Sequence, residues 1–198
     1  MDAFFSKWLI VRSGFRQHRG DDECNGCVQI GRDLATLYSG PSQRVELGAW
    51  DNDPEDTADY IYRWSGGDSP PQVMLVGYSW GAGYGVVQLA KQLRERNIRV
   101  QHAVLCDPVK HSVAVWRAMI PRTIFHHIQI TIPSNIESVY WLRQYEDKPA
   151  GHDLVAESPY TKIHAPYILK CGHVEADNDP AFYEMCLNVA RRFFEQEP

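Results

Sequence analysis

Continuous apolar runs alternate along the chain with segments in which apolar residues recur at helical spacing. The runs predict strands at 7–15, 44–50, 71–79, 98–109, 137–147 and 160–172. The helical spacing predicts helices at 27–38, 54–64, 80–97 and 180–197, and the second of these opens on Asp53 and Pro54 as cap and first turn. This alternation predicts an α/β fold, a three-layer sandwich in which helices cover both faces of a mostly parallel central sheet.

The tract 110–135 fits this alternation less well than its surroundings. At 198 residues the chain is expected to form a single domain, 1–198, and the tract is its possible small cap or insertion. The hydrophobic share of 44% and the charged share of 23% are those of an ordinary globular protein. A net charge of -5 gives no electrostatic reason to expect nucleic acid or an anionic membrane as partner.

The apolar runs and the cysteines indicate where in the cell the protein is expected. None of the runs approaches the ~20 residues that a membrane-spanning helix needs, so no integral membrane association is expected. The first residues carry no basic segment ahead of their short apolar stretch, which argues against a signal peptide. The five cysteines, read as buried free thiols, favour a reducing compartment, so a cytoplasmic location is expected.

Cys24 and Cys27 have the CxxC spacing of redox and zinc sites. No second pair completes a four-ligand zinc site, so we interpret the segment around Asn25 and Gly26 as a surface turn. No metal and no cofactor are expected.

A polar serine stands between two glycines where the strand at 71–79 gives way to a helix. The stretch Gly77-Tyr78-Ser79-Trp80-Gly81 has the GxSxG spacing of a nucleophile elbow, a tight turn that lifts a serine hydroxyl above the sheet edge. The glycines allow strand and helix to approach closely there. A preceding apolar strand and a following helix make the motif far more specific than the five letters alone. In this context the chain resembles the α/β-hydrolase superfamily, in a minimal version without the first strands of the larger enzymes.

The resemblance implies a Ser–acid–His triad in that chain order, with Ser79 as nucleophile. Asp107 in "LCDPV" follows the strand after the elbow helix, and it resembles the Leu-Asp-Pro segment that carries the acid in the pancreatic-lipase branch. Most members place the acid one strand later, where Asp147 and Asp153 stand as alternatives. Asp107 is the predicted acid.

The base should follow the last strand. His173 comes after Cys171-Gly172 and before the last helix, where the family places its base, and it is the predicted residue. His164 and His152 remain alternatives. His111, His126 and His127 lie too early in the chain.

The resemblance also implies an oxyanion hole and a substrate pocket. The backbone N–H of Trp80, after the serine, is one expected donor, and that of Phe15, after the first strand, is the other, although the family's frequent His-Gly pair is absent there. Apolar residues of the tract 110–135 are candidates to bind an acyl group: Trp116, Met119, Ile120 and Phe125.

The function expected from these features is that of a serine hydrolase cleaving an ester or thioester of a small molecule through an acyl-enzyme. Two alternatives remain at this point: a cell-envelope or phage-type esterase with the same site, and a non-catalytic hydrolase-like binding domain. Acyl length, leaving group and oligomeric state are not indicated by the sequence.

Overall fold

The computed structural model describes residues 4–17, 26–66, 70–110 and 129–195. The strands are β1 (Lys7–Arg12), β2 (Gln43–Gly48), β3 (Gln72–Tyr78), β4 (Val100–Cys106), β5 (Gln129–Ile132), β6 (Ile136–Arg143), β7 (Asp153–Ala156), β8 (Lys162–Ile163) and β9 (Tyr167–Ile168). The helices are α1 (Gly26–Tyr38), α2 (Pro54–Arg63), α3 (Val86–Glu95) and α5 (Pro180–Glu195). A π-helical turn (Gly81–Gly85) precedes α3, and a 3₁₀ turn (Ala176–Asn178) precedes α5.

The main sheet has the strand order β2-β1-β3-β4-β6-β8, with β9 also pairing with β6. Every strand pair in the described part of the chain is parallel. The chain moves from β1 outward to β2 and then returns to the other side of β1 for β3. Ligands of open parallel sheets bind beyond the carboxyl ends of the strands at such a reversal. The predicted α/β class with a mostly parallel central sheet is confirmed.

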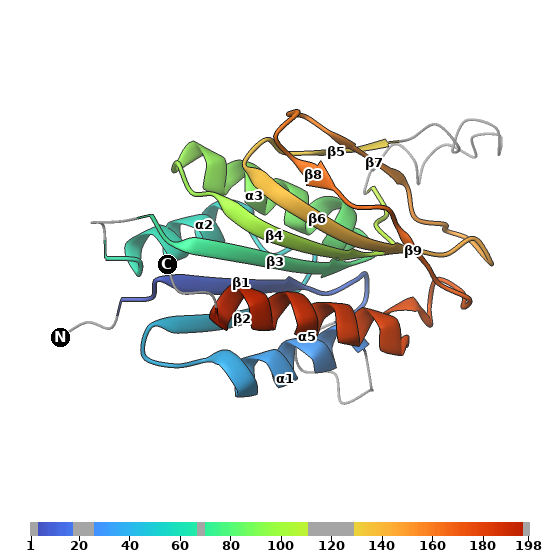
Figure 1. Cartoon of the computed structure of the whole chain (residues 1–198), viewed down its shortest axis with the longest axis horizontal. Helices are drawn as coiled ribbons and strands as arrows, with labels where there is room; N and C mark the ends of the chain where they lie inside the picture. The colour runs from blue at the N-terminus through green and yellow to red at the C-terminus, as the bar shows by residue number, and fades with distance from the viewer. Residues whose placement is uncertain (1–3, 18–25, 67–69, 111–128, 196–198) are drawn as a thin grey trace.

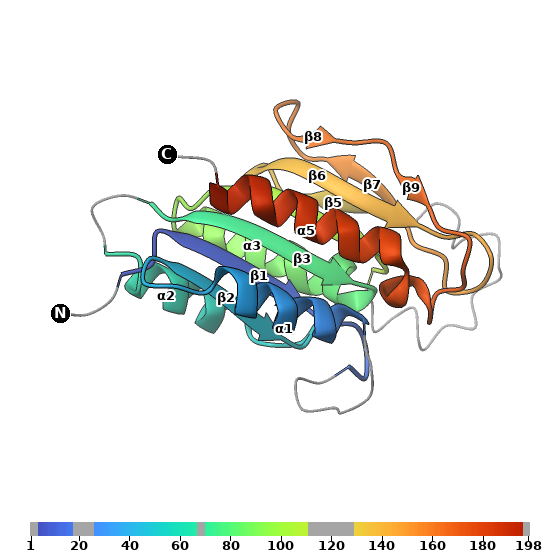
Figure 2. The same cartoon turned by 60° about the horizontal axis from the view of Figure 1, so that its bottom comes forward.

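Alternate side chains of the central strands build two separate cores. Trp8 and Ile10 of β1 face α2 and α3, whereas Leu9 and Val11 face α1 and α5. Figures 1 and 2 show the two helical layers on opposite faces of the sheet. Because both faces are covered, the central strands are apolar at successive positions, which is the pattern of a buried parallel strand.

Polar contacts at the ends of the helices fix the layers to the sheet. Asp53 caps α2, since its Oδ1 accepts the main-chain N–H groups of Glu55 and Asp56 at 2.8 and 3.0 Å. The ammonium group of Lys7 donates to the main-chain oxygens of Phe193 and Phe194 near the end of α5. These contacts satisfy backbone groups that a helix end leaves without intrahelical partners.

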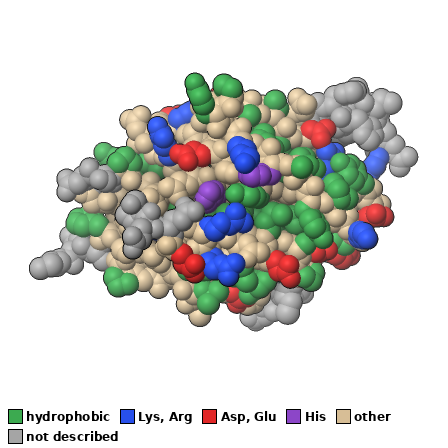
Figure 3. All heavy atoms as spheres, viewed as in Figure 1, with side chains coloured by type: hydrophobic (Ala, Val, Ile, Leu, Met, Phe, Trp, Pro, Cys, Tyr) green, Lys and Arg blue, Asp and Glu red, His purple; other side chains and the backbone are tan. Residues whose placement is uncertain are grey.

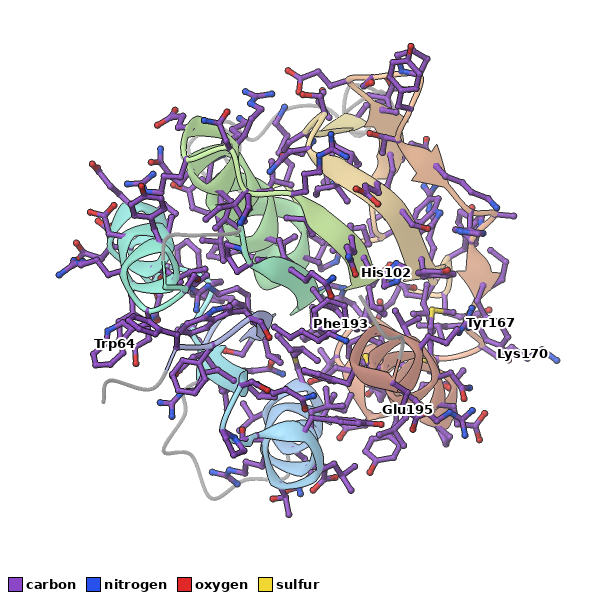
Figure 4. All side chains as sticks on the ribbon, turned by 60° about the vertical axis from the view of Figure 1, so that its left-hand side comes forward. Trp64, His102, Tyr167, Lys170, Phe193 and Glu195 are labelled. Atoms are coloured by element: carbon purple, nitrogen blue, oxygen red, sulfur yellow. The ribbon has the colours of Figure 1, made fainter. Side chains whose placement is uncertain are left out.

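His102 on β4 lies against α5. Its ring packs edge to face on Phe193, with centroids 6.4 Å apart (Figure 4). On the face seen in Figure 3, acidic and basic side chains are interspersed among hydrophobic ones. Across the described residues, none of the helices combines the length and apolar character that crossing a bilayer requires.

Two features of the structure differ from the expected elements. β5 and β7 form a second, two-stranded sheet that the apolar pattern did not indicate. The stretch 160–172 gives two strands of two residues each, β8 and β9, on either side of Ala165 and Pro166, because proline cannot donate to a strand ladder. The tract 110–135 lies largely outside the described residues, and its last part contains β5.

Candidate active site

Ser79 occupies a strained turn at the carboxyl end of β3. Its φ angle of 54° lies in the left-handed region, which is uncommon for a residue other than glycine. The turn is held by its own backbone: the N–H of Ser79 donates to the oxygen of Cys106 at 3.0 Å, and its oxygen accepts from the N–H groups of Gly83 and Val109. The strain is therefore offset by hydrogen bonds to β4 and to the segment after it.

The two glycines of the motif are needed because backbone approaches them closely. A Cβ on Gly77 would lie 2.7 Å from Cα of Ala82, and one on Gly81 would lie 2.2 Å from the main-chain oxygen of Arg12. Neither distance is possible without moving the backbone. The elbow therefore packs directly on the end of β1, and the close approach of strand and helix that the glycine spacing predicted is found between Gly77 and Ala82.

The Ser79 hydroxyl and the His173 ring form a hydrogen bond. Oγ lies 2.9 Å from Nε2, and both residues are buried. His173 belongs to the segment between β9 and α5, so 94 positions of sequence separate it from Ser79.

Asp107 forms a hydrogen bond with the other nitrogen of this ring. Its Oδ2 lies 2.6 Å from Nδ1 of His173, and the aspartate is wholly buried. The carboxylate also accepts the main-chain N–H groups of Gln144 and Gly151 at Oδ1 and the Nε2 of Gln144 at Oδ2. A buried carboxylate requires such a set of donors to remain in the interior.

The main chain of His173 is fixed at both polar groups. Its oxygen accepts the Tyr78 hydroxyl at 2.5 Å, and its N–H donates to Oδ1 of Asp147 at 2.7 Å. Burial, together with the nearby Asp177, raises the pKa of Tyr78, so its hydroxyl stays protonated and can donate. These contacts hold the imidazole between Ser79 and Asp107.

The structure separates the alternatives that chain order left open. Asp147 contacts the backbone of His173 and not its ring, and Asp153, on β7, pairs with Arg143. His164 bonds the hydroxyl of Ser138, which stands in a regular strand, and His152 accepts the N–H of Lys110. Of the candidate side chains, Ser79, Asp107 and His173 are the ones that form one continuous hydrogen-bonded chain.

The two residues predicted to supply oxyanion donors lie together beside the elbow. The Phe15 ring is 4.4 Å from the Trp80 ring, and Trp50, after β2, is 4.9 Å from Trp80. Tyr84 of the π-helical turn packs on Trp50 at 6.1 Å. Trp50 and Tyr84 gave no signal in the sequence, because only the fold brings the ends of β1, β2 and β3 to one edge.

The four candidate acyl-binding residues lie outside the described residues: Trp116, Met119, Ile120 and Phe125. Cys27 is fully buried in α1, in agreement with the expected helix at 27–38 and with a buried thiol, whereas Cys24 and Asn25 of the expected surface turn lie outside the described part. The free thiol of Cys27 packs inward because α1 begins at Gly26 and turns that side to the sheet. Within the described ranges, no three His, Cys, Asp or Glu side chains are arranged to hold a metal ion.

Comparison with known proteins adds little. No protein-family model matches the chain, and no curated protein does. Two solved structures of the Vlm2 thioesterase domain, each bound with a dodecadepsipeptide, are similar to it at 10% sequence identity. One match covers 97% of this chain and 95% of the other with a TM-score of 0.42, and the second covers 98% and 95% with a TM-score of 0.43. Scores this low carry no argument about function, which must come from the site itself.

Proposed function

We propose that this chain is a serine hydrolase of the α/β-hydrolase superfamily that cleaves an ester or thioester through an acyl-enzyme. The observation that carries the proposal is the continuous contact from Ser79 Oγ through the His173 ring to Asp107, at 2.9 and 2.6 Å. Nucleophile, base and orienting acid at these distances are the geometric signature of this chemistry. The strained backbone of Ser79 supports the same interpretation.

Each of the three side chains has a distinct role in the proposed reaction. Nε2 of His173 accepts the proton of the Ser79 hydroxyl as Oγ attacks the carbonyl carbon, and it later returns that proton to the leaving group. Asp107 keeps the proton of the ring on Nδ1, so that Nε2 is free to accept. Water then attacks the acyl-serine with the same histidine as base.

Charge that develops on the carbonyl oxygen needs donors close to Ser79. The N–H of Trp80 stands at the start of the helical segment that follows the serine, where the helix dipole favours negative charge. The N–H of Phe15 is the second donor in the proposal, because the Phe15 ring packs directly on Trp80.

The aromatic residues beside the elbow favour an apolar substrate. Phe15 is exposed, and Trp50, Trp80 and Tyr84 are half-buried at the same edge of the sheet. Apolar walls with few polar groups bind acyl or alkyl portions better than charged ones. Nitrophenyl esters of graded acyl length are therefore the substrates to test first.

The test is hydrolysis by the purified Ser79→Ala variant. The alanine methyl group fits the elbow, so the fold should persist while kcat falls by ~10⁴-fold or more, as when a triad member is deleted. Ser138→Ala is the matched control, because Ser138 also bonds a histidine, at 3.1 Å from Nε2 of His164, but stands in a regular strand. Retained activity in Ser79→Ala would rule out the proposal, and so would equal losses in the two variants.

A further inference from the structure

The loop that follows β1 lies directly against the elbow. A Cβ on Gly14 would lie 2.8 Å from Cδ1 of Tyr78, the residue before the serine. The next residue, Phe15, packs its ring on Trp80, the residue after the serine. Consecutive residues of the loop therefore contact both neighbours of Ser79, and a small displacement of the loop moves the N–H of Phe15 relative to the serine.

Gln17 fixes the shape of this loop with its side chain. Its Oε1 accepts the main-chain N–H of Gly14 at 2.9 Å, and its main-chain oxygen accepts the hydroxyl of Ser13 at 2.7 Å. Its Nε2 donates to Oδ2 of Asp177 at 2.8 Å, across 160 positions of sequence. One side-chain amide thus joins the loop to a distant part of the chain.

Asp177 connects the loop to the segment that carries His173. It lies in the 3₁₀ turn after the histidine, and the N–H of Ala176 donates to the oxygen of His173 at 3.3 Å. Oδ2 of Asp177 also accepts the N–H of Cys27 at the start of α1, at 3.0 Å, and the residue is 2% exposed. The loop, the base segment and α1 therefore meet at one buried carboxylate.

We propose that Gln17 and Asp177 are positioning residues, which hold the loop so that the N–H of Phe15 faces the substrate oxygen that becomes negative in the reaction. The N–H of Gly14 is engaged by Gln17, so the next amide along the loop is the donor that the pair presents. This inference rests on the proposed function and deepens it. Neither side chain reaches the reacting atoms, and both act through the loop.

The variant Gln17→Glu turns this arrangement into a pH-dependent one. At acid pH, the introduced carboxyl group and Asp177 share one proton, so the loop keeps its contacts. As the pH rises, both carboxylates ionise and repel each other at hydrogen-bond distance.

Cys27, Tyr78 and Cys106 also face Asp177, and burial raises the pKa of all three, so they stay neutral between pH 5 and 8. His173 also faces this carboxylate. The contribution of His173 is common to the variant and the unmodified enzyme. It therefore cancels when the kcat of the variant is divided by the kcat of the unmodified enzyme at the same pH.

The experiment measures kcat and KM for a nitrophenyl ester from pH 5 to 8. Relative to the unmodified enzyme, kcat of Gln17→Glu should be within about threefold at pH 5 and fall by about ten- to hundredfold at pH 8, since losing an oxyanion donor costs up to about 10²–10³ in kcat. KM should change little, because the donor acts in the transition state. Gln29→Glu is the matched control, because Gln29 donates to Asp33 at 2.8 Å on the exposed side of α1. The kcat of this variant relative to the unmodified enzyme should not change with pH.

For each variant we also measure the labelling of Ser79 by a fluorophosphonate and the thermal midpoint of unfolding, so that a misfolded sample is recognised. If the wild type is active and labelled, and the kcat of Gln17→Glu equals that of the wild type at every pH, this inference alone is overturned. A loss that is equal at pH 5 and 8, or that appears in KM and not in kcat, also overturns it. A wild type that is neither labelled nor active overturns the proposed function together with this inference.

Discussion

Replacing Asp107 by asparagine should nearly abolish turnover, and the donors around this carboxylate show why. Oδ1 accepts two main-chain N–H groups, from Gln144 at 3.2 Å and Gly151 at 2.9 Å, so this position must remain an oxygen. The new amide NH₂ must then stand at the position of Oδ2, facing Nδ1 of His173 and Nε2 of Gln144. Turning the amide over would instead present NH₂ to two backbone donors.

An NH₂ facing Nδ1 forces the imidazole proton onto Nε2. The ring then donates to Ser79 and cannot accept its proton, which is the defect that costs about 10⁴-fold in kcat in enzymes of this kind. That factor corresponds to ~5 kcal/mol of transition-state stabilisation. The donor–donor contact with Gln144 should also lower the free energy of unfolding by about 1–3 kcal/mol.

The assay is steady-state hydrolysis at neutral pH, with the folded state of each variant checked by circular dichroism. Asp153→Asn is the control, since Asp153, on β7, pairs with Arg143 of β6, and this variant should lose little kcat. Asp147→Asn should also cost far less than Asp107→Asn, because its amide oxygen can still accept the N–H of His173. A folded Asp107→Asn enzyme with more than about a tenth of the kcat would refute this reasoning, and a larger loss in Asp147→Asn would move the acid to that residue.

Two further predictions concern stability. Gly81→Ala should lower the free energy of unfolding by ~2 kcal/mol or more in urea titrations, because its Cβ would meet Arg12 O at 2.2 Å and the backbone must shift; an unchanged midpoint would contradict the packing of the elbow on β1. Burial raises the pKa of Asp177, so the carboxyl group stays protonated to higher pH in the folded protein than in the unfolded chain. The free energy of unfolding therefore falls as the pH rises from the pKa of the unfolded chain to that of the folded protein. Asp177→Asn should therefore gain stability relative to the unmodified protein at pH 7 but not at pH 3, and a gain that is the same at both values would contradict the assignment.

The fold was predictable because the central strands are buried on both faces. Continuous apolar runs located β1, β3 and β4, and helical spacing located the layers around them. β5 and β7 escaped this reasoning because each has four residues and alternates exposed with more buried positions. The π-helical turn also carries no periodic signal, since it consists of glycines, an alanine and a tyrosine over Gly81–Gly85.

The candidate site was predictable where local patterns encode it. The glycine spacing marks Ser79, and chain order restricted the acid and the base to a few residues each. The choice among those residues required distances, and the catalytic role of Ser79, Asp107 and His173 stays a prediction. Gln144, Gln17 and Asp177 could not be found from the sequence, because their contacts join segments 37 to 160 positions apart.

The central claim is that Ser79 is an activated nucleophile, and a fluorophosphonate probe tests it most directly. These probes react with a serine hydroxyl that a neighbouring base deprotonates, so peptide mapping by mass spectrometry should find one phosphonylated residue, Ser79. Labelling should disappear in His173→Ala and persist in His164→Ala, whose histidine bonds Ser138 instead. An unlabelled folded protein, or an adduct on a residue other than Ser79, would contradict the account.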